Sequence, residues 1–292
     1  MAFSETPRKS VVAGRFYPDD PAALRADVLR YLGLRPRKLV DLRGKDILCM
    51  LVPHAGYVFS GPIAGLTLGR ITLPDRLIVL GPNHTGMGAP ISVWNGGPWQ
   101  TPLGAMPMDR DAAEALINAN AGFTGDIEAH AKEHSLEVLV PFFQVMNPKV
   151  RMTAVTVSGV PFAMLREAGD ALGAVLAEAD KAGERILLIV SSDMSHYLPH
   201  ERAVTMDSIA LNAMKTLDPE TYFSTVKDNN ISMCGVFPMT MALFALAHLG
   251  ATSARVLSYA TSGQTGRAFG ADMERVVGYA GAVITRQCNN VV

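Results

Sequence analysis

The chain has 292 residues, of which 49% are hydrophobic and 18% are charged, and its formal net charge is −1. This length and apolar content suit one large α/β domain with a sizeable core, and we expect residues 1–292 to form a single domain. The near-neutral charge, without a basic or acidic block, argues against nucleic acid or a membrane surface as a partner.

The sequence also indicates the compartment in which the protein works. Its longest apolar runs are far shorter than a membrane span, and its N-terminus lacks the apolar core of a signal peptide. The three cysteines, Cys49, Cys234 and Cys288, are too widely spaced to indicate a disulfide framework. We therefore expect a cytoplasmic protein.

The first part of the chain alternates predicted helices with predicted strands. Asp19 or Asp20 can cap the first helix, and Pro21 suits its first turn. Continuous apolar runs predict buried strands, and clustered Gly and Pro predict loops. The expected elements are a helix over 21–32, a strand over 47–52, a helix ending at Arg70, strands over 77–80 and 91–94, and a loop over 96–104.

The same alternation continues to the end of the chain. Ser135 is a plausible cap for an apolar helix that runs towards Met146. The other expected elements are helices over 109–118, 161–181, 200–216, 219–227 and 237–249, and strands over 152–157, 185–190, 254–259 and 276–284. Strands that alternate with helices predict a three-layer α/β/α sandwich with a largely parallel (mixed) central sheet.

Histidine and aspartate follow three of the buried strands. His54 comes after the strand at 47–52, His84 after the strand at 77–80, and Asp193 and His196 after the strand at 185–190. In a parallel sheet, ligands bind beyond the carboxyl ends of the strands. These residues therefore predict the functional site.

Two neutral imidazoles and one anionic ligand can hold a divalent metal and leave positions open for substrate. His54 and His84 could supply the imidazoles, and the anionic ligand could be Cys234, Asp193 or Glu137. Cys234 opens a predicted helix, whose dipole favours a thiolate, and a thiolate favours copper, zinc or iron. Asp193 and His196 could then orient ligands or shuttle protons.

Each of these residues also has a purely structural interpretation. Cys234 could be a small buried hydrophobe, as we expect for Cys49. Asp193 could cap a helix, and Glu137 could belong to a helix-terminal capping arrangement. The hydroxyls at 191–192 could only satisfy backbone groups. The remaining histidines, His130, His200 and His248, have no comparable placement at strand ends, and we interpret the last two as structural.

Seven short motifs follow one another along the chain: AGRFYP at 13–18, PHAGY at 53–57, GPNH at 81–84, TPLG at 101–104, EHSLE at 133–137, SSDMSHY at 191–197 and CG at 234–235. Each motif is weak alone, but the ordered set is specific. It resembles the Memo family, whose bacterial and archaeal members are called AmmeMemoRadiSam system protein B. The match runs from about residue 11 to residue 284, which implies one Memo-like domain over 1–292.

The resemblance implies a fold like that of the class III extradiol ring-cleaving dioxygenases, whose non-haem iron is held by two His and one Glu. It places one divalent or redox-active metal on His54, His84 and Cys234, with iron or copper favoured over zinc. A cysteine stands where the dioxygenases carry a carboxylate. The resemblance implies that the catalytic residues of the same pocket are Asp193 and His196, with His134 and Glu137 nearby.

Three functions fit these observations. The first is a metal-dependent, dioxygenase-like redox enzyme whose substrate the sequence does not identify. The second is a hydrolase or transferase with Cys234 as its nucleophile. The third is a binding or accessory protein, since animal Memo proteins are linked to phosphorylated peptides and the prokaryotic name implies radical SAM and AMMECR-type partners. The ligand is accordingly a small molecule or a peptide, and no P-loop or dinucleotide fingerprint indicates a nucleotide.

Overall fold

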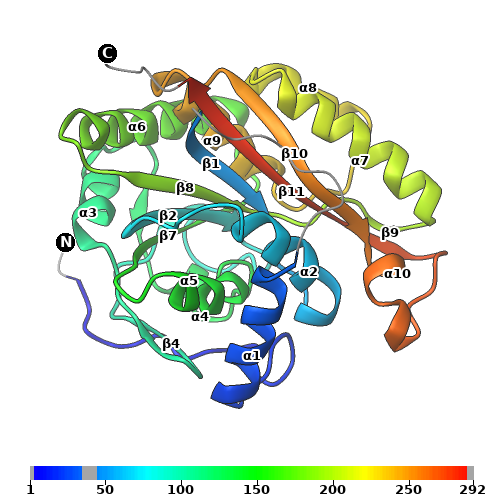
Figure 1. The fold of residues 1–292 in the computed structure, drawn as a ribbon. Helices are drawn as coiled ribbons and strands as arrows, with labels where there is room; N and C mark the ends of the chain where they lie inside the picture. The colour runs from blue at the N-terminus through cyan, green and yellow to red at the C-terminus, as the bar shows by residue number, and fades with distance from the viewer. Residues whose placement is uncertain (1–2, 35–44, 288–292) are drawn as a thin grey trace.

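The computed structural model describes residues 3–34 and 45–287. A mixed sheet runs through the middle of this part of the chain (Figure 1). Its strands are β1 (Lys45–Val52), β2 (Arg76–Pro82), β3 (Ile91–Val93), β6 (Thr124–Gly125), β7 (Arg151–Val157), β8 (Ile186–Ser191), β9 (His196–Leu198), β10 (Ser253–Thr261) and β11 (Val276–Gln287).

Within the described residues the strand order is β10-β11-β1-β8-β2-β7-β3-β6, and β9 pairs with β11. The four central strands β1, β8, β2 and β7 are parallel to one another. The antiparallel pairs β1 with β11, β10 with β11, and β3 with β7 extend the sheet on both sides. The predicted largely parallel but mixed sheet is confirmed.

Helices cover both faces of the sheet and make the outer layers (Figure 1). One face carries α1 (Pro21–Leu32), α2 (Tyr57–Leu68) and α5 (Val140–Met146). The other carries α3 (Arg110–Asn118), α6 (Phe162–Lys181), α7 (His200–Lys215), α8 (Pro219–Asp228) and α9 (Val236–His248). The short helices α4 (Glu128–Ala131) and α10 (Ser262–Thr265) lie in connections. The three-layer α/β/α prediction is therefore correct.

The central strands read as continuous apolar runs because both of their faces are buried. In β2, Leu77 and Val79 join the core under α1 and α2, whereas Ile78 and Leu80 join the core under α6 and α9. Successive side chains of a strand point to opposite faces, so each strand contributes to both cores. Each fully buried side chain of this kind stabilises the fold by about 1.5–3 kcal/mol.

The helix starts follow ordinary capping chemistry. Asp20, one of the two residues expected to cap the first helix, accepts a hydrogen bond from the Ala23 amide at 2.8 Å. Asp109 caps α3 and Asp218 caps α8 in the same way. Each such side chain satisfies an amide that has no partner inside the helix.

Two local predictions need correction. The segment at 96–104 is not only a loop, because it contains β4 (Trp99–Thr101), which pairs with β5 (Gly104–Met106) in a short hairpin. Ser135 does not cap the following helix: its hydroxyl donates to the Pro82 carbonyl at 2.8 Å. The helical turn begins only at the 3-10 segment Glu137–Leu139, which leads into α5. A buried carbonyl nearby is the better partner for this hydroxyl.

None of the helices in residues 3–34 and 45–287 is long and apolar enough to cross a membrane. Cys49 is fully buried in β1, as expected for a core residue, and it is a free thiol. Cys288 lies outside the described residues.

Candidate metal centre

The strand order brings the sequence-predicted residues to one place. Strand β8 lies between β1 and β2, and all three are parallel, so their carboxyl ends meet at one edge of the sheet. His54, His84 and Asp193 each come two residues after one of these strands. The two histidines therefore flank the end of the strand that carries Asp193.

Cys234 reaches the same edge from the loop that precedes α9. The Gly235 amide donates to the Ser192 hydroxyl at 2.9 Å, which ties this loop to the end of β8. A Cβ atom at Gly235 would lie 2.3 Å from the Ser192 Cβ, so only glycine allows this approach. The Cys234 sulfur in turn accepts a hydrogen bond from the Asp193 amide at 3.2 Å.

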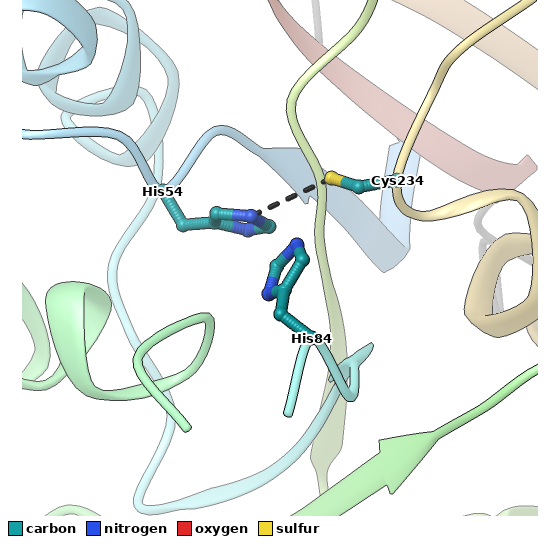
Figure 2. Close-up of side chains that lie close together, drawn as sticks. All are labelled: His54, His84 and Cys234. Carbon is teal, nitrogen blue, oxygen red and sulfur yellow. Dashed lines mark hydrogen bonds between the residues drawn. The ribbon is translucent and has the colours of Figure 1, made fainter. Parts of the chain in front are cut away.

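Figure 2 shows the two imidazoles and the thiol converging from three separate segments. The His54 Nε2 lies 3.5 Å from the Cys234 sulfur, and the rings of His54 and His84 are 5.4 Å apart. Donor atoms of His54, His84 and Cys234 all lie within 4.8 Å of one another. This spacing is compact enough for one ion, since metal–nitrogen and metal–sulfur bonds are about 2.0–2.3 Å long.

The hydrogen bonds around His54 define its tautomer. The Ser191 hydroxyl donates to the Ser135 carbonyl at 2.6 Å, and its oxygen lies 2.7 Å from the His54 Nδ1. Because that hydroxyl has one proton and uses it on the carbonyl, Nδ1 must be the donor to the hydroxyl oxygen. The Nε2 lone pair is then directed at Cys234. Burial lowers the pKa of His54 well below 6.5, which keeps the ring neutral and able to bind a metal.

Glu133 accepts a hydrogen bond from the Nδ1 of His84, as the Ser191 hydroxyl does from the Nδ1 of His54. Its carboxylate accepts from the His84 Nδ1 at 2.9 Å and from the backbone amides of His84, His134 and Ser135. A carboxylate can only accept here, so the His84 proton sits on Nδ1 and Nε2 faces the centre. Burial alone would raise the pKa of Glu133, but its hydrogen bond with His84 and the other contacts lower it to about 2.

The Cys234 thiol is protonated at neutral pH in the absence of a metal. Burial raises its pKa to about 12, and the charge of Asp193 adds to this effect against the opposing hydrogen bonds of Ser192 and Asp193. Burial thus outweighs the thiolate-stabilising effect expected from the start of a helix. Since metals bind the thiolate, loading this site would release a proton.

A cavity of about 600 Å³ opens beside the centre, and Asp193, His196 and His134 line it. Burial raises the pKa of Asp193 to about 6, although the His54 amide donates to its carboxylate at 2.9 Å. The His196 Nδ1 donates to the Ser232 carbonyl at 2.8 Å, which leaves Nε2 available. His134 stacks on His84 with ring centres 4.8 Å apart, and burial lowers the pKa of this imidazole.

Glu137 lies apart from this group. It is fully buried, and its carboxylate accepts from the Arg8 guanidinium at 2.6 Å, from the Tyr17 hydroxyl at 2.7 Å, and from the amides of Val11 and Val12. These contacts occupy both oxygens and tie the N-terminal segment to the 3-10 turn. The structure thus brings six of the seven predicted site residues together and directs Glu137 elsewhere.

Two residues of this region were absent from the sequence-based set. Glu133 was overlooked, although a carboxylate beside His134 was a usable signal, because metal-binding histidines regularly donate their second N–H to a carboxylate. Arg8 gave no signal, since a single arginine near the N-terminus is ordinarily a surface residue. The contacts of both residues cross more than 45 positions of sequence.

These residues fit a metal ion by their chemistry. Two imidazole nitrogens and one sulfur form a donor set suited to copper, iron or zinc. A second group of donors, His84, Glu133 and His134, lies beside the first and shares its histidine. The fold and the site therefore define an α/β/α protein with a candidate metal centre at the carboxyl edge of its sheet.

Comparison with known proteins gives the family. The family model described as "Memo-like protein" matches residues 8–283. A "MEMO1 family protein" of Aquifex aeolicus is 37% identical over 280 residues, which cover 94% of this chain and 98% of the relative. The "MEMO1 family protein MK0963" of Methanopyrus kandleri is also 37% identical, over 96% of this chain and 99% of the relative. The chain belongs to the Memo family.

Proposed function

We propose that this Memo-family protein binds one divalent or redox-active metal ion through His54, His84 and Cys234, with iron or copper preferred over zinc. The observation that supports the proposal is the convergence of the three donor atoms within 4.8 Å. The tautomers support it further, because Ser191 and Glu133 each take up the Nδ1 proton of one ligand histidine. Such partners orient metal-binding imidazoles and raise their basicity.

We further propose that the protein is a dioxygenase-like oxidoreductase. A bound iron or copper ion would supply the redox chemistry and an open coordination position. Asp193 can hold or release a proton near neutral pH, since burial raises its pKa to about 6. His196 lines the same cavity and uses Nδ1 on the Ser232 carbonyl, and His134, which stacks on His84, lines it too. These are the groups that a general acid–base role requires.

The test is anaerobic purification followed by metal quantification. We expect one iron or copper per chain in the wild type and loss of that metal in His84→Ala and Cys234→Ala. The controls are His248→Ala, which removes a surface histidine paired with Asp170, and Cys49→Ala, which removes the buried core thiol. Wild-type protein without stoichiometric metal, or equal loading of His84→Ala, contradicts the metal function. Metal-free protein that co-purifies with a radical SAM or AMMECR-type partner would favour an accessory role.

A second candidate function has one observation in its favour. The Cys234 sulfur lies 3.5 Å from the His54 Nε2, which is the contact that a cysteine nucleophile makes with its base. The raised pKa of Cys234 opposes this function, because the nucleophile is the thiolate. A thiol-alkylating probe distinguishes the two. Rapid labelling of Cys234 that added metal does not slow favours the nucleophile, whereas slow labelling that metal blocks favours the metal ligand.

A further inference from the structure

The cavity beside the metal centre has apolar walls and a charged rim. Its aromatic lining comes from the N-terminal segment, from the start of α2 and from β9, and consists of Phe16, Tyr17, Tyr57, Phe59 and Tyr197. Its volume of about 600 Å³ is in the range of sites that enclose a small organic molecule. Flat aromatic walls favour a ligand with an apolar, planar body.

Arg15 places a positive charge at the rim of this cavity. Its side chain is exposed and lines the cavity, and within the described residues it makes no ion pair or side-chain hydrogen bond. Its backbone, by contrast, is held in a tight turn, because the Arg15 amide donates to the Val12 carbonyl and the Gly14 amide donates to the Tyr17 carbonyl. A guanidinium on a fixed turn that has no ion-pair partner in residues 3–34 and 45–287 can pair with a ligand.

Two of the three carboxylates in the described lining of the cavity already have partners within the protein. Asp27 pairs with Arg30 at 2.8 Å, and Asp193 accepts from the His54 amide. Asp19 lies on the same turn as Arg15, is exposed to solvent, and so offsets the arginine only weakly. A guanidinium binds a carboxylate through two parallel hydrogen bonds, which gives orientation as well as affinity.

We propose that the cavity binds a small organic acid whose carboxylate pairs with Arg15 and whose apolar body lies against the aromatic walls. This names the ligand class of the metal centre, and its catalytic meaning rests on the function proposed above. A single carboxylate matches the single arginine of the described lining. A phosphate group carries more charge and more acceptor oxygens than one arginine satisfies. Arg15 is therefore the specificity-determining residue of the cavity.

The experiment compares an acid with a neutral molecule of the same shape. Benzoate and benzamide are titrated into the chelator-treated full-length protein, and binding is followed by ligand-observed NMR. We expect the wild type to bind benzoate about tenfold more tightly than benzamide, and Arg15→Gln to remove that preference. The matched control is Arg185→Gln, which removes an exposed arginine at the opposite end of β8 and keeps the preference.

Removing the metal excludes direct binding of benzoate to the ion, so any remaining preference comes from the protein. Equal binding of the two probes by the wild type, or an unchanged preference in Arg15→Gln, overturns the proposal. Displacement of benzoate by equimolar inorganic phosphate overturns the choice of a carboxylate. Metal content of the same proteins is measured separately, so loss of the anion preference and failure of the metal function are distinct results.

Discussion

The two glutamates of the motif at 133–137 lie four residues apart and have different hydrogen-bond partners. Glu137 accepts from Arg8, from Tyr17 and from two backbone amides, so its contacts are complete within the protein. Glu133 accepts from the Nδ1 of His84, whose Nε2 is left facing His54 and Cys234. Both carboxylates are buried.

This difference in partners indicates a structural role for Glu137 and a role at the candidate site for Glu133. A buried polar group whose partners all lie within the chain stabilises one arrangement of that chain. A buried group that orients the lone pairs of several side chains towards one point can instead support the binding of a metal ion. We call the first region, Arg8 with Glu137, the N-terminal clamp, and the second, His54 with His84 and Cys234, the candidate metal centre. The following predictions test this division.

Breaking the N-terminal clamp should cost the most stability. Arg8→Met leaves the Glu137 carboxylate buried beside backbone amides without its guanidinium, because both side chains are almost fully buried. Loss of one partner of a buried ion pair costs about 3–5 kcal/mol of unfolding free energy. Urea unfolding of the metal-free protein measures this loss. The control is Arg110→Met, which removes an exposed pair with Glu5 and should cost under about 1 kcal/mol.

A clamp variant that unfolds at the wild-type urea concentration would contradict the structural interpretation of Glu137. It would also reopen the sequence-based expectation that this residue acts in the pocket.

Replacing Glu133 should act on the candidate metal centre. Glu133→Gln presents an NH₂ group to backbone amides and weakens the hydrogen bond that fixes the His84 tautomer. Loss of such a partner lowers metal affinity about 10–100-fold, or about 1.4–2.7 kcal/mol. Chelator competition measures the affinity, and Glu128→Gln, an exposed change in α4, is the control. Unchanged affinity in Glu133→Gln would mean that this carboxylate only satisfies the backbone.

The buried residue His130, which belongs to neither region, should make the stability of the fold sensitive to acid. Burial lowers the pKa of this imidazole to about 3, and the positive charge of Arg8 acts in the same direction. The unfolded chain binds a proton near pH 6.5, whereas the folded chain does not. The stability from this group is therefore complete above pH 6.5 and is lost as the pH falls towards 3. The slope is about 1.4 kcal/mol per pH unit.

Urea unfolding between pH 6.5 and pH 4 measures that slope. His130→Phe should reduce it by about 1.4 kcal/mol per pH unit, which is the contribution of one proton. The substitution suits the site because the ring packs against Trp94 and Trp99. An identical slope in the variant would mean that groups other than His130 bind the extra protons of the unfolded chain.

The smallest expected effect concerns the rim of the cavity. Tyr197 has a positive φ of 59°, and its side chain is 66% exposed. Non-glycine residues are strained in this conformation, so Tyr197→Gly should be about 1 kcal/mol more stable than Tyr197→Ala. Thermal unfolding of the two variants measures the difference. Equal stabilities of the two variants would show that the backbone at residue 197 relaxes and is not strained.

Much of this architecture follows from local sequence. The apolar runs at 77–80 and 185–190 predict strands buried on both faces, because only such strands lack polar alternation. The histidines just beyond them predict a site at the carboxyl edge of the sheet. The prediction missed the hairpin at 99–106 because Thr101-Pro102-Leu103-Gly104 is typical of a turn and the two paired strands are only three residues long each.

The sequence by itself determined the layers, the parallel centre of the sheet and the edge at which chemistry can occur. The residue pattern left the third donor open among Cys234, Asp193 and Glu137, and the family resemblance placed it on Cys234. Only the tertiary structure decided the contacts of these three residues: the sulfur of Cys234 lies beside His54, Asp193 accepts from the His54 amide, and Glu137 accepts from Arg8. The physical reason is that strand and helix periodicities are local, whereas each of these three contacts joins residues more than 100 positions apart in the sequence.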